Sequence, residues 1–245
     1  MKKTIPENRK SYESKETAER YSEFAEKGLF EYEIAVVKRF FAPGMTVLDI
    51  GCGTGRTTGP LCEMGIDAIG IDFSSAMIAK ARQTHPSVNF MRCDAKDLSP
   101  FPNESADGIL FSLNGLALLT PNEKETALKE FFRVLKPGGA FVFCIPPLNI
   151  KEGYFKSKAE SLGLDISNYY DRIRIGDETY DDNGSAVSIS IPFECDMMTM
   201  LESCGFEIAL KESSLSIIKE NPENLNETIV WVATKASDFM FSDMP

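Results

Sequence analysis

The stretch Val47-Leu48-Asp49-Ile50-Gly51-Cys52-Gly53-Thr54-Gly55 decides the fold class. Thr46–Ile50 is a short, β-branched and apolar run, and three glycines in the next five residues close it. We expect a helix to follow over Thr57–Met64. Glycines permit positive φ values and let a ligand approach the backbone closely, and a helix N-terminus offers unpaired N–H groups to an anionic group. The stretch therefore predicts a ligand-binding turn between a strand and a helix.

Short strands alternate with helices on the C-terminal side of this turn. The expected strands are Ala68–Ile71, Val88–Arg92, Asp107–Leu113 and Ala140–Ile145, and the expected helices are Ser74–Gln83 and Glu123–Leu135. This alternation predicts βαβ units, and therefore a parallel sheet with helices on both faces. On the N-terminal side, Lys15–Lys27 and Phe30–Phe41 carry apolar residues at the helical period and predict two helices.

The alternation stops after Pro146-Pro147. Arg172–Tyr180 and Ser185–Pro192 alternate apolar and polar residues on either side of an Asn-Gly pair, which is a strong hairpin signal. A helix over Cys195–Ser203 and strands over Glu207–Leu215 and Thr228–Thr234 are expected to follow. We interpret residues 1–245 as one domain, with N-terminal helices over 15–41, a core over 42–149, an insertion over 150–193 and the rest of the sheet over 194–235.

Composition and charge limit the possible classes of protein. The 245 residues include 26 Lys+Arg and 37 Asp+Glu, so the net charge is −11, which argues against a broad surface for nucleic acid or anionic membrane. Six cysteines form no CxxC pair and accompany one histidine, a pattern typical of neither a zinc finger nor a disulfide scaffold. No apolar run approaches the ~20 residues of a membrane span, and the N-terminus lacks the apolar stretch of a secretory signal. We expect a reduced, soluble, cytoplasmic protein.

The glycine spacing and two further acids narrow the choice of ligand. A dinucleotide fingerprint would place its third glycine at position 56, which is Arg. Asp72 ends the second strand, where a carboxylate can accept both hydroxyls of a ribose. Asp94 ends the third strand, where it can accept a hydrogen bond from an adenine amino group. An NAD-dependent oxidoreductase remains an alternative, opposed by Arg56 and by the absence of a Tyr-x-x-x-Lys pair after the fourth strand.

From Tyr21 to Thr234 the chain resembles the class I S-adenosylmethionine-dependent methyltransferases, specifically their small-molecule, type-11 or ubiquinone-pathway-like branch. The matching motifs are the glycine stretch over 47–55, Gly70-Ile71-Asp72-Phe73-Ser74, Arg92-Cys93-Asp94-Ala95, the fourth strand from Ala106 to Ser112, and Arg133-Val134-Leu135-Lys136-Pro137-Gly138-Gly139. The resemblance implies an α/β fold: a Rossmann-like, doubly wound sheet of seven strands whose last strand runs antiparallel.

The resemblance also implies a cofactor, S-adenosyl-L-methionine, with S-adenosyl-L-homocysteine as the product. The residues expected to bind it are Asp49, Gly51, Cys52, Gly53, Gly55, Asp72, Phe73, Met77, Asp94, Ala95, Ser112 and Tyr21, with Tyr12 as a weaker candidate. No metal is expected. Aromatic residues of the insertion (Tyr154, Tyr169, Tyr170, Tyr180 and Phe193) are expected either to wall the acceptor site or to pack the insertion onto the sheet.

We expect methyl transfer to a small-molecule acceptor by direct displacement, which needs alignment and exclusion of water more than a covalent intermediate. The sequence identifies no general base. His85 lies in a loop expected at the edge away from the strand carboxyl ends, and Asn114 either orients a nucleophile or, as we favour, caps a loop. Two alternatives remain: a cofactor-binding or scaffold protein without turnover, and an RNA or protein methyltransferase. The sequence does not predict the oligomeric state or the acceptor.

Overall fold

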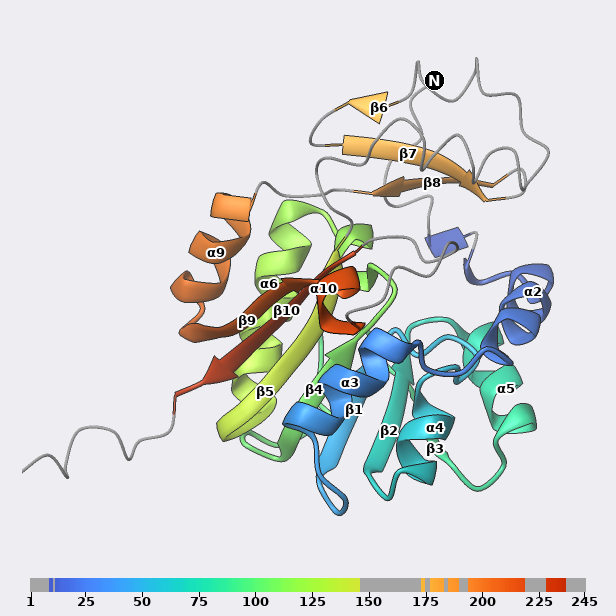
Figure 1. The fold of residues 1–245 in the computed structure, drawn as a ribbon. Helices are drawn as coiled ribbons and strands as arrows, with labels where there is room; N and C mark the ends of the chain where they lie inside the picture. The colour runs from blue at the N-terminus through green and yellow to red at the C-terminus, as the bar shows by residue number, and fades with distance from the viewer. Residues whose placement is uncertain are drawn as a thin grey trace, which may run out of the picture.

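The computed structural model of the chain describes residues 9–10, 12–145, 173–174, 177–182, 185–189, 194–218 and 228–236. Seven strands form one sheet (Figure 1). In spatial order they are β3 (Asn89–Arg92), β2 (Asp67–Asp72), β1 (Thr46–Ile50), β4 (Ala106–Phe111), β5 (Leu135–Ile145), β10 (Ile229–Lys235) and β9 (Phe206–Ser213). The pairs from β3 to β5 are parallel, whereas β10 runs antiparallel to both of its neighbours. The predicted seven-stranded sheet with an antiparallel last strand is confirmed.

Strand β1 lies where the order of the sheet reverses. From β1 the chain moves outward to β2 and β3, and then returns to form β4 on the other side of β1. Val47 and Leu48 pack into different clusters on the two faces, so the strand is buried on both sides. Such a reversal leaves a crevice at the carboxyl ends of the two central strands, where open α/β sheets bind ligands.

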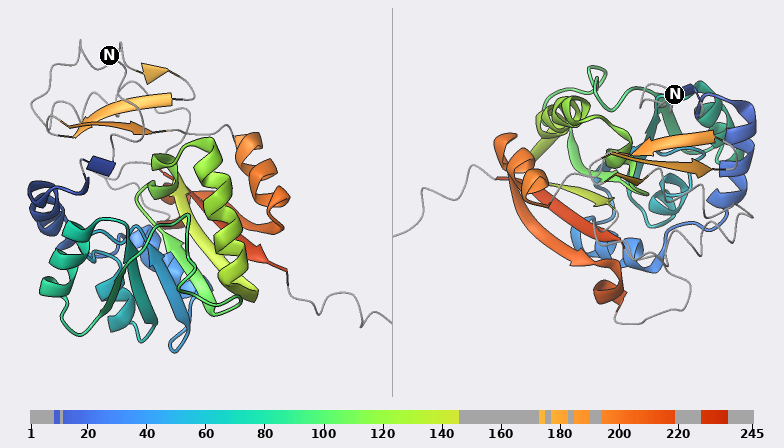
Figure 2. Two further views of the ribbon diagram at one scale, coloured as in Figure 1. Left: turned by 180° about the vertical axis from the view of Figure 1, so that it is seen from behind. Right: turned by 90° about the horizontal axis from the view of Figure 1, so that it is seen from above.

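Helices cover both faces of the sheet (Figure 2). They are α2 (Lys15–Ala25), α3 (Glu31–Phe40), α4 (Thr58–Glu63), α5 (Ser75–Thr84), α6 (Pro121–Val134), α9 (Glu194–Ser203) and α10 (Ser214–Ile218), with a 3₁₀ turn η1 at Gly115–Leu118. Residues of α6 and α9 pack into one core cluster, and residues of α3 and α4 pack into the other. Ser74 or Ser75 could cap α5 from the sequence alone; the structure has Ser74 as the N-cap, and its side chain accepts a hydrogen bond from the Met77 N–H.

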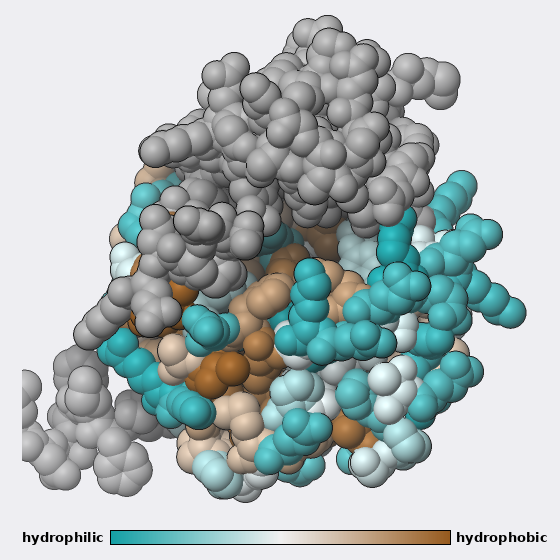
Figure 3. Space-filling model, turned by 45° about the vertical axis from the view of Figure 1, so that its right-hand side comes forward, coloured by the Kyte–Doolittle hydropathy of each residue, from teal (hydrophilic) through white to brown (hydrophobic). Residues whose placement is uncertain are grey.

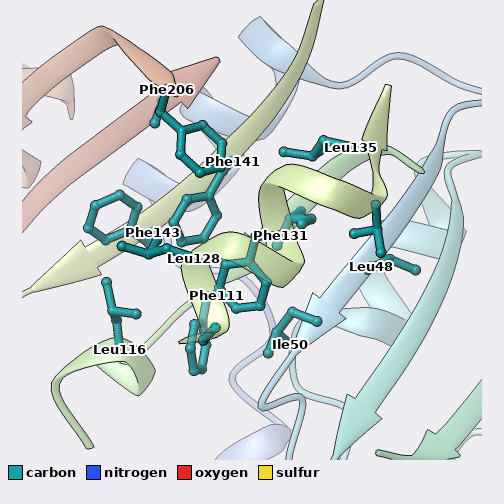
Figure 4. Packing of buried hydrophobic residues seen from close by; sticks show 14 of the residues in the cluster. Leu48, Ile50, Phe111, Leu116, Leu128, Phe131, Leu135, Phe141, Phe143 and Phe206 are labelled. Atoms are coloured by element: carbon teal, nitrogen blue, oxygen red, sulfur yellow. The ribbon is translucent and has the colours of Figure 1, made fainter. Parts of the chain in front are cut away.

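The larger core cluster is rich in aromatic side chains. Phe131 of α6 lies between Phe111 of β4 and Phe141 of β5, with ring centroids 6.0 and 5.0 Å away (Figure 4). Phe141 also stacks on Phe143, which in turn stacks on Trp231 of β10. Burying each such ring contributes roughly 1.5–3 kcal/mol, so this cluster holds the parallel and antiparallel halves of the sheet together.

A second, three-stranded sheet lies above the carboxyl edge of the main sheet (Figure 1). It comprises β6 (Ile173–Arg174), β7 (Asp177–Asp182) and β8 (Ser185–Ile189), paired antiparallel. Asp182 pairs with Ser185, so two residues, Asn183 and Gly184, connect the strands. The predicted hairpin is therefore confirmed. The side chains expected to wall the acceptor site, from Tyr154 to Phe193, lie outside the described residues or belong to strand positions whose side chains are not described.

Several predicted boundaries are wrong. Strand β4 ends at Phe111 instead of Leu113, because Leu113 and Asn114 both adopt positive φ values and turn the chain away. Strand β5 begins at Leu135, before the glycine pair expected to precede it, because Leu135 pairs with Ala106 across a bulge. Helix α6 begins at Pro121, with Thr120 as its N-cap, instead of at Glu123.

The surface of the described part is mostly polar. Figure 3 shows hydrophilic side chains over much of the right-hand face, with smaller apolar areas between them. Only Met91, Leu113 and Met198 are large hydrophobic residues counted as exposed among the described positions. Among the described helices, none combines the length and apolar character that a membrane span requires.

Replacing Gly70 by alanine should destabilise the fold. A Cβ at Gly70 would lie 2.4 Å from the Phe90 ring and 2.9 Å from Thr58 Oγ1. We expect Gly70→Ala to lower the free energy of unfolding by about 1–3 kcal/mol, the usual cost of overpacking, as measured by chemical denaturation. The double variant Gly70→Ala/Phe90→Leu should recover part of that loss. A Gly70→Ala protein as stable as the wild type would contradict this packing.

Candidate functional site

The turn after β1 is shaped by two different requirements on its glycines. Gly51 has φ +64°, and a Cβ there would lie 2.8 Å from the Phe111 ring, so the position needs glycine for packing. Gly53 has φ +54°, but an added Cβ would meet no atom within 4 Å. Gly53 therefore faces open space, and its backbone is open to close approach by a ligand.

The carboxylate of Asp72 lies directly beside this open glycine. Asp72 Oδ2 accepts a hydrogen bond from the Gly53 N–H at 2.9 Å, and Oδ1 accepts one from the Ser74 N–H at 2.8 Å. Its side chain is nearly buried, and burial raises its pKa to about 6 despite these two hydrogen bonds. The structure thus brings together two of the predicted residues, one after β1 and one at the end of β2.

Asp49 lies beneath the turn and not at its surface. Only 1% of the residue is exposed, and its Oδ2 accepts hydrogen bonds from Thr57 Oγ1 and Thr58 Oγ1, both at 2.6 Å. Burial raises the pKa of Asp49 to about 6 against the effect of those hydroxyls. Asp49 therefore anchors the start of α4 and lies too deep to face the open side of the turn.

Asp94 and Phe73 stand side by side, and Arg9 contacts both. Arg9 Nη1 lies 2.7 Å from Asp94 Oδ2, and the Arg9 guanidinium carbon lies 4.5 Å from the centroid of the Phe73 ring. Lys96 adds a more distant contact, with Nζ 3.9 Å from Asp94 Oδ2. The carboxylate that was expected to bind an adenine amino group is therefore paired with a side chain of this protein.

The N-terminal segment is attached to the site at further points. The Tyr12 carbonyl accepts a hydrogen bond from Ser74 Oγ at 2.7 Å, and the Tyr21 carbonyl accepts one from Thr54 Oγ1 at 3.0 Å. The rings of Tyr12 and Tyr21 meet edge to face at 5.8 Å. Both tyrosines expected near the cofactor thus lie at the glycine turn, consistent with the position of α2 beside α5 (Figure 1).

A buried ion pair that the sequence analysis missed joins the turn to α3. Arg56 and Glu33 form two hydrogen bonds of 2.7 Å, and Ser112 Oγ donates a further hydrogen bond to Glu33. We had interpreted Arg56 only as an argument against a dinucleotide. Arg56 and Glu33 are 23 positions apart, so no local sequence pattern links them. The sequence offers one indication of a buried partner: Glu33, the third residue of α3, lies on the same buried face as Val36 and Val37.

Asn114 does not cap the loop as we favoured. It occupies the N-cap position of η1 at φ +61°, yet its side chain makes no capping hydrogen bond. Its Oδ1 atom is buried and has no hydrogen-bond partner among the described residues. An unsatisfied buried acceptor costs about 1–3 kcal/mol, so a ligand that donates a hydrogen bond here would recover that cost.

The remaining predicted residues lie in the turn, in α5 and after β3. Met77 and Cys52 are buried, whereas Ala95 is partly buried against the larger core cluster. The imidazole of His85 packs close to Gly55 and Gly59, behind the turn, so it lies nearer to the glycines than its loop position suggested. Within the described part of the chain, no group of three or more His, Cys, Asp or Glu side chains could hold a metal ion.

Comparison with known proteins agrees with this geometry. Residues 47–139 match the sequence model of a family described as a methyltransferase domain. A demethylmenaquinone methyltransferase of Renibacterium salmoninarum is 38% identical over 100 residues, which are 41% of this chain and 40% of that protein. A trans-aconitate 2-methyltransferase of Delftia acidovorans is 36% identical over 102 residues, covering 41% and 37%.

The similarity to solved structures extends over more of the chain. A S-adenosylmethionine-dependent methyltransferase from Methanosarcina mazei aligns with a TM-score of 0.66 at 23% identity, covering 86% of this chain and 100% of that one. The chain thus shares the Rossmann-like α/β fold of that protein. Residues 47–139, which carry the glycine turn, thus resemble a methyltransferase domain in sequence, and the fold resembles that of the Methanosarcina mazei methyltransferase. The chain spans about two-fifths of the length of curated relatives that it matches.

The buried acids predict a characteristic pH dependence of stability. The pKa values of Asp49 and Asp72 are raised from 3.8 to about 6, so the folded protein holds these protons more tightly than the unfolded chain. The free energy of unfolding should therefore fall as pH rises from about 4 to about 6, by up to about 3 kcal/mol for each carboxyl. Carboxyls with lowered pKa values, such as Asp107 and Glu130, change the free energy of unfolding only at pH values below this range.

Chemical denaturation between pH 4 and 7 would measure this effect. Asp49→Asn removes one of the two raised groups while it keeps the shape of the side chain, so roughly half of the decline should disappear. An unchanged slope in this variant would show that Asp49 does not titrate in the window.

Proposed function

We propose that this protein transfers a methyl group from S-adenosylmethionine to a small-molecule acceptor by direct displacement. The observation that carries the proposal is the pairing of an open glycine, Gly53, with the carboxylate of Asp72 at the reversal point of the sheet. This combination places a backbone that is open to close approach beside a carboxylate, at the place where α/β sheets bind nucleosides. Its support from the comparisons is the match of residues 47–139 to a methyltransferase domain.

The residues around the turn fit the chemistry of the cofactor. Asp72 would accept hydrogen bonds from the ribose hydroxyls, and Gly53 leaves room for the ligand to approach the backbone. Phe73 offers an aromatic face and Asp94 an acceptor, which suits a planar base with an amino group. Ser112 contacts Glu33, and the Tyr21 carbonyl contacts Thr54, so both would lie near the methionine end of the cofactor.

Bound S-adenosylmethionine would supply a methyl group already activated by its sulfonium. The protein then needs to orient the acceptor and exclude water. Among the described residues, burial raises the pKa values of Tyr32, Cys52 and Cys144, so these groups remain protonated at neutral pH and do not serve as bases. Asn114 Oδ1 is the uncommitted acceptor after β4 and would receive a hydrogen bond from an O–H or N–H of the acceptor.

The class of acceptor follows from two observations. The relatives named demethylmenaquinone and trans-aconitate methyltransferases act, by their names, on small molecules, and these differ widely from each other. The net charge of −11 makes a polyanionic acceptor such as RNA a poor match. We therefore propose a small-molecule acceptor without assigning the atom that is methylated.

A protein that binds the cofactor without turning it over is the second candidate. Its support is the lack of an evident general base among the described residues. Formation of S-adenosylhomocysteine in the presence of any acceptor would eliminate it, and a panel of small phenols, quinols, carboxylic acids and amines is the appropriate first screen.

Replacing Asp72 should weaken cofactor binding. We expect Asp72→Ala to lower the affinity for S-adenosylhomocysteine by at least tenfold, since a hydrogen bond to a charged group contributes about 1.5–3 kcal/mol. Calorimetric titration with S-adenosylhomocysteine, and with NADH in parallel, measures this. Asp67→Ala, at the exposed opposite end of the same strand, is the matched control. Unchanged affinity in a folded Asp72→Ala protein would remove this residue from the site, and binding of NADH alone would contradict the proposed cofactor.

Replacing Arg9 should strengthen cofactor binding. Its guanidinium is planar, lies over Phe73 and bonds Asp94, so it uses the groups that an adenine base would use. We expect Arg9→Ala to raise the affinity for S-adenosylhomocysteine several-fold, and salt to raise the wild-type affinity because the pair is partly exposed. Lys10→Ala is the control. A loss of affinity in Arg9→Ala would instead identify Arg9 as a group that helps to hold the ligand.

A further inference from the structure

Arg56 and Glu33 form the most deeply buried ion pair of the described residues. Their side chains are 6% and 3% exposed, and two parallel hydrogen bonds of 2.7 Å join Nη1 to Oε2 and Nη2 to Oε1. Every other ion pair in the described ranges has both side chains at least 12% exposed. A bidentate pair of this kind fixes the orientation of both groups as well as their distance.

The pair is connected to the loop between α2 and α3. Arg56 Nη1 also donates to the Gly28 carbonyl at 2.6 Å, and Glu33 Oε2 accepts the Phe30 N–H at 2.7 Å. The Phe30 ring covers the guanidinium, with 4.7 Å between its centroid and the guanidinium carbon. These contacts fix the loop that precedes α3 against the residue that follows Gly55.

The same pair also reaches the end of β4. Ser112 Oγ donates a hydrogen bond to Glu33 Oε1 and accepts one from Arg56 Nη2 at 3.0 Å. One ion pair therefore joins three segments that are distant in sequence: the glycine turn after β1, the turn after β4, and the α2–α3 loop. These segments border the crevice at the reversal point of the sheet, where the proposed cofactor would bind.

We infer that Arg56 and Glu33 are positioning residues for the cofactor site, acting through Ser112 and the glycine turn. This inference rests on the proposed function. Burying two charges costs desolvation free energy that their attraction repays only in part, and apolar replacements of similar volume are often as stable. A binding site, by contrast, needs its groups held within about 0.5 Å, which directional hydrogen bonds provide. The pair should thus matter more for ligand affinity than for stability.

The double variant Arg56→Met/Glu33→Leu separates these two roles. It removes both charges together and fills their volume with apolar atoms. We expect a Tm close to that of the wild type, and an affinity for S-adenosylhomocysteine reduced at least tenfold in calorimetric titration. The single variant Arg56→Met leaves Glu33 buried without its partner, so its Tm should fall well below that of the double variant.

Two further proteins complete the test. Lys129→Met/Glu125→Leu, which replaces an exposed pair on α6, is the matched control and should bind like the wild type. Arg56→Lys keeps the charge but loses the bidentate geometry, so it should fold and bind S-adenosylhomocysteine more weakly than the wild type and more tightly than the double variant. If the double variant does not fold, the affinity of Arg56→Lys tests the positioning role. Wild-type affinity in a folded Arg56→Met/Glu33→Leu or Arg56→Lys protein would overturn the positioning role. Absence of binding in the wild type would overturn the proposed cofactor itself, and the inference with it.

Discussion

Three buried carboxylates control the conformation of the turn after β1. Asp72 accepts the Gly53 N–H, Glu33 accepts the Arg56 guanidinium, and Asp49 accepts the hydroxyls of Thr57 and Thr58. A buried carboxylate is costly unless it is hydrogen-bonded or paired. Residues 53–58 supply these donors, whereas the N–H groups of Ser74 and Phe30 and the Ser112 hydroxyl supply further hydrogen bonds to Asp72 and Glu33. The acids are thus fixed by neighbouring segments, and they in turn fix the conformation of residues 53–58. The orientation of Gly53 toward open space follows from that constraint.

The three acids come from three different parts of the chain. Asp49 belongs to β1, Asp72 to the end of β2, and Glu33 to the helix α3 that precedes the sheet. The turn therefore forms completely only after β2 and α3 have packed, so the binding site depends on the tertiary fold. This dependence explains why a short glycine sequence can specify a site: the surrounding acids hold the Gly53 N–H and the side chains of Arg56, Thr57 and Thr58 in place before any ligand arrives.

Much of the sheet could be predicted because local patterns and tertiary structure agree there. β1 has the predicted bounds, the Asn-Gly hairpin forms, and Ser74 caps α5. The end of β4 was misjudged because Leu113 adopts φ +48°, a conformation that its residue type does not favour. In the site, the placement of Asp72 beside the glycines followed from strand order. The contacts of Arg56 and Arg9 could not be predicted, since each joins residues that only the packed fold brings together.

The proposed cofactor-binding groups and the segments above the main sheet differ in how regular the surrounding structure is. Most candidate cofactor groups lie at or just after the carboxyl ends of β1, β2, β3 and β4, so the regular sheet fixes their positions. Above the carboxyl edge, around the β6–β8 sheet, the chain departs from the regular alternation of strands and helices. Asn114 follows β4, and its buried Oδ1 has no hydrogen-bond partner among the described residues.

A crystal structure of the protein with S-adenosylhomocysteine would test the central claim most directly. We expect the ribose hydroxyls to lie within hydrogen-bond distance of the Asp72 carboxylate, the ligand to pass over Gly53, and the Arg9 guanidinium to have left the face of Phe73. A ligand bound elsewhere, or a bound ligand that makes no contact with Asp72 or the glycine turn, would contradict it.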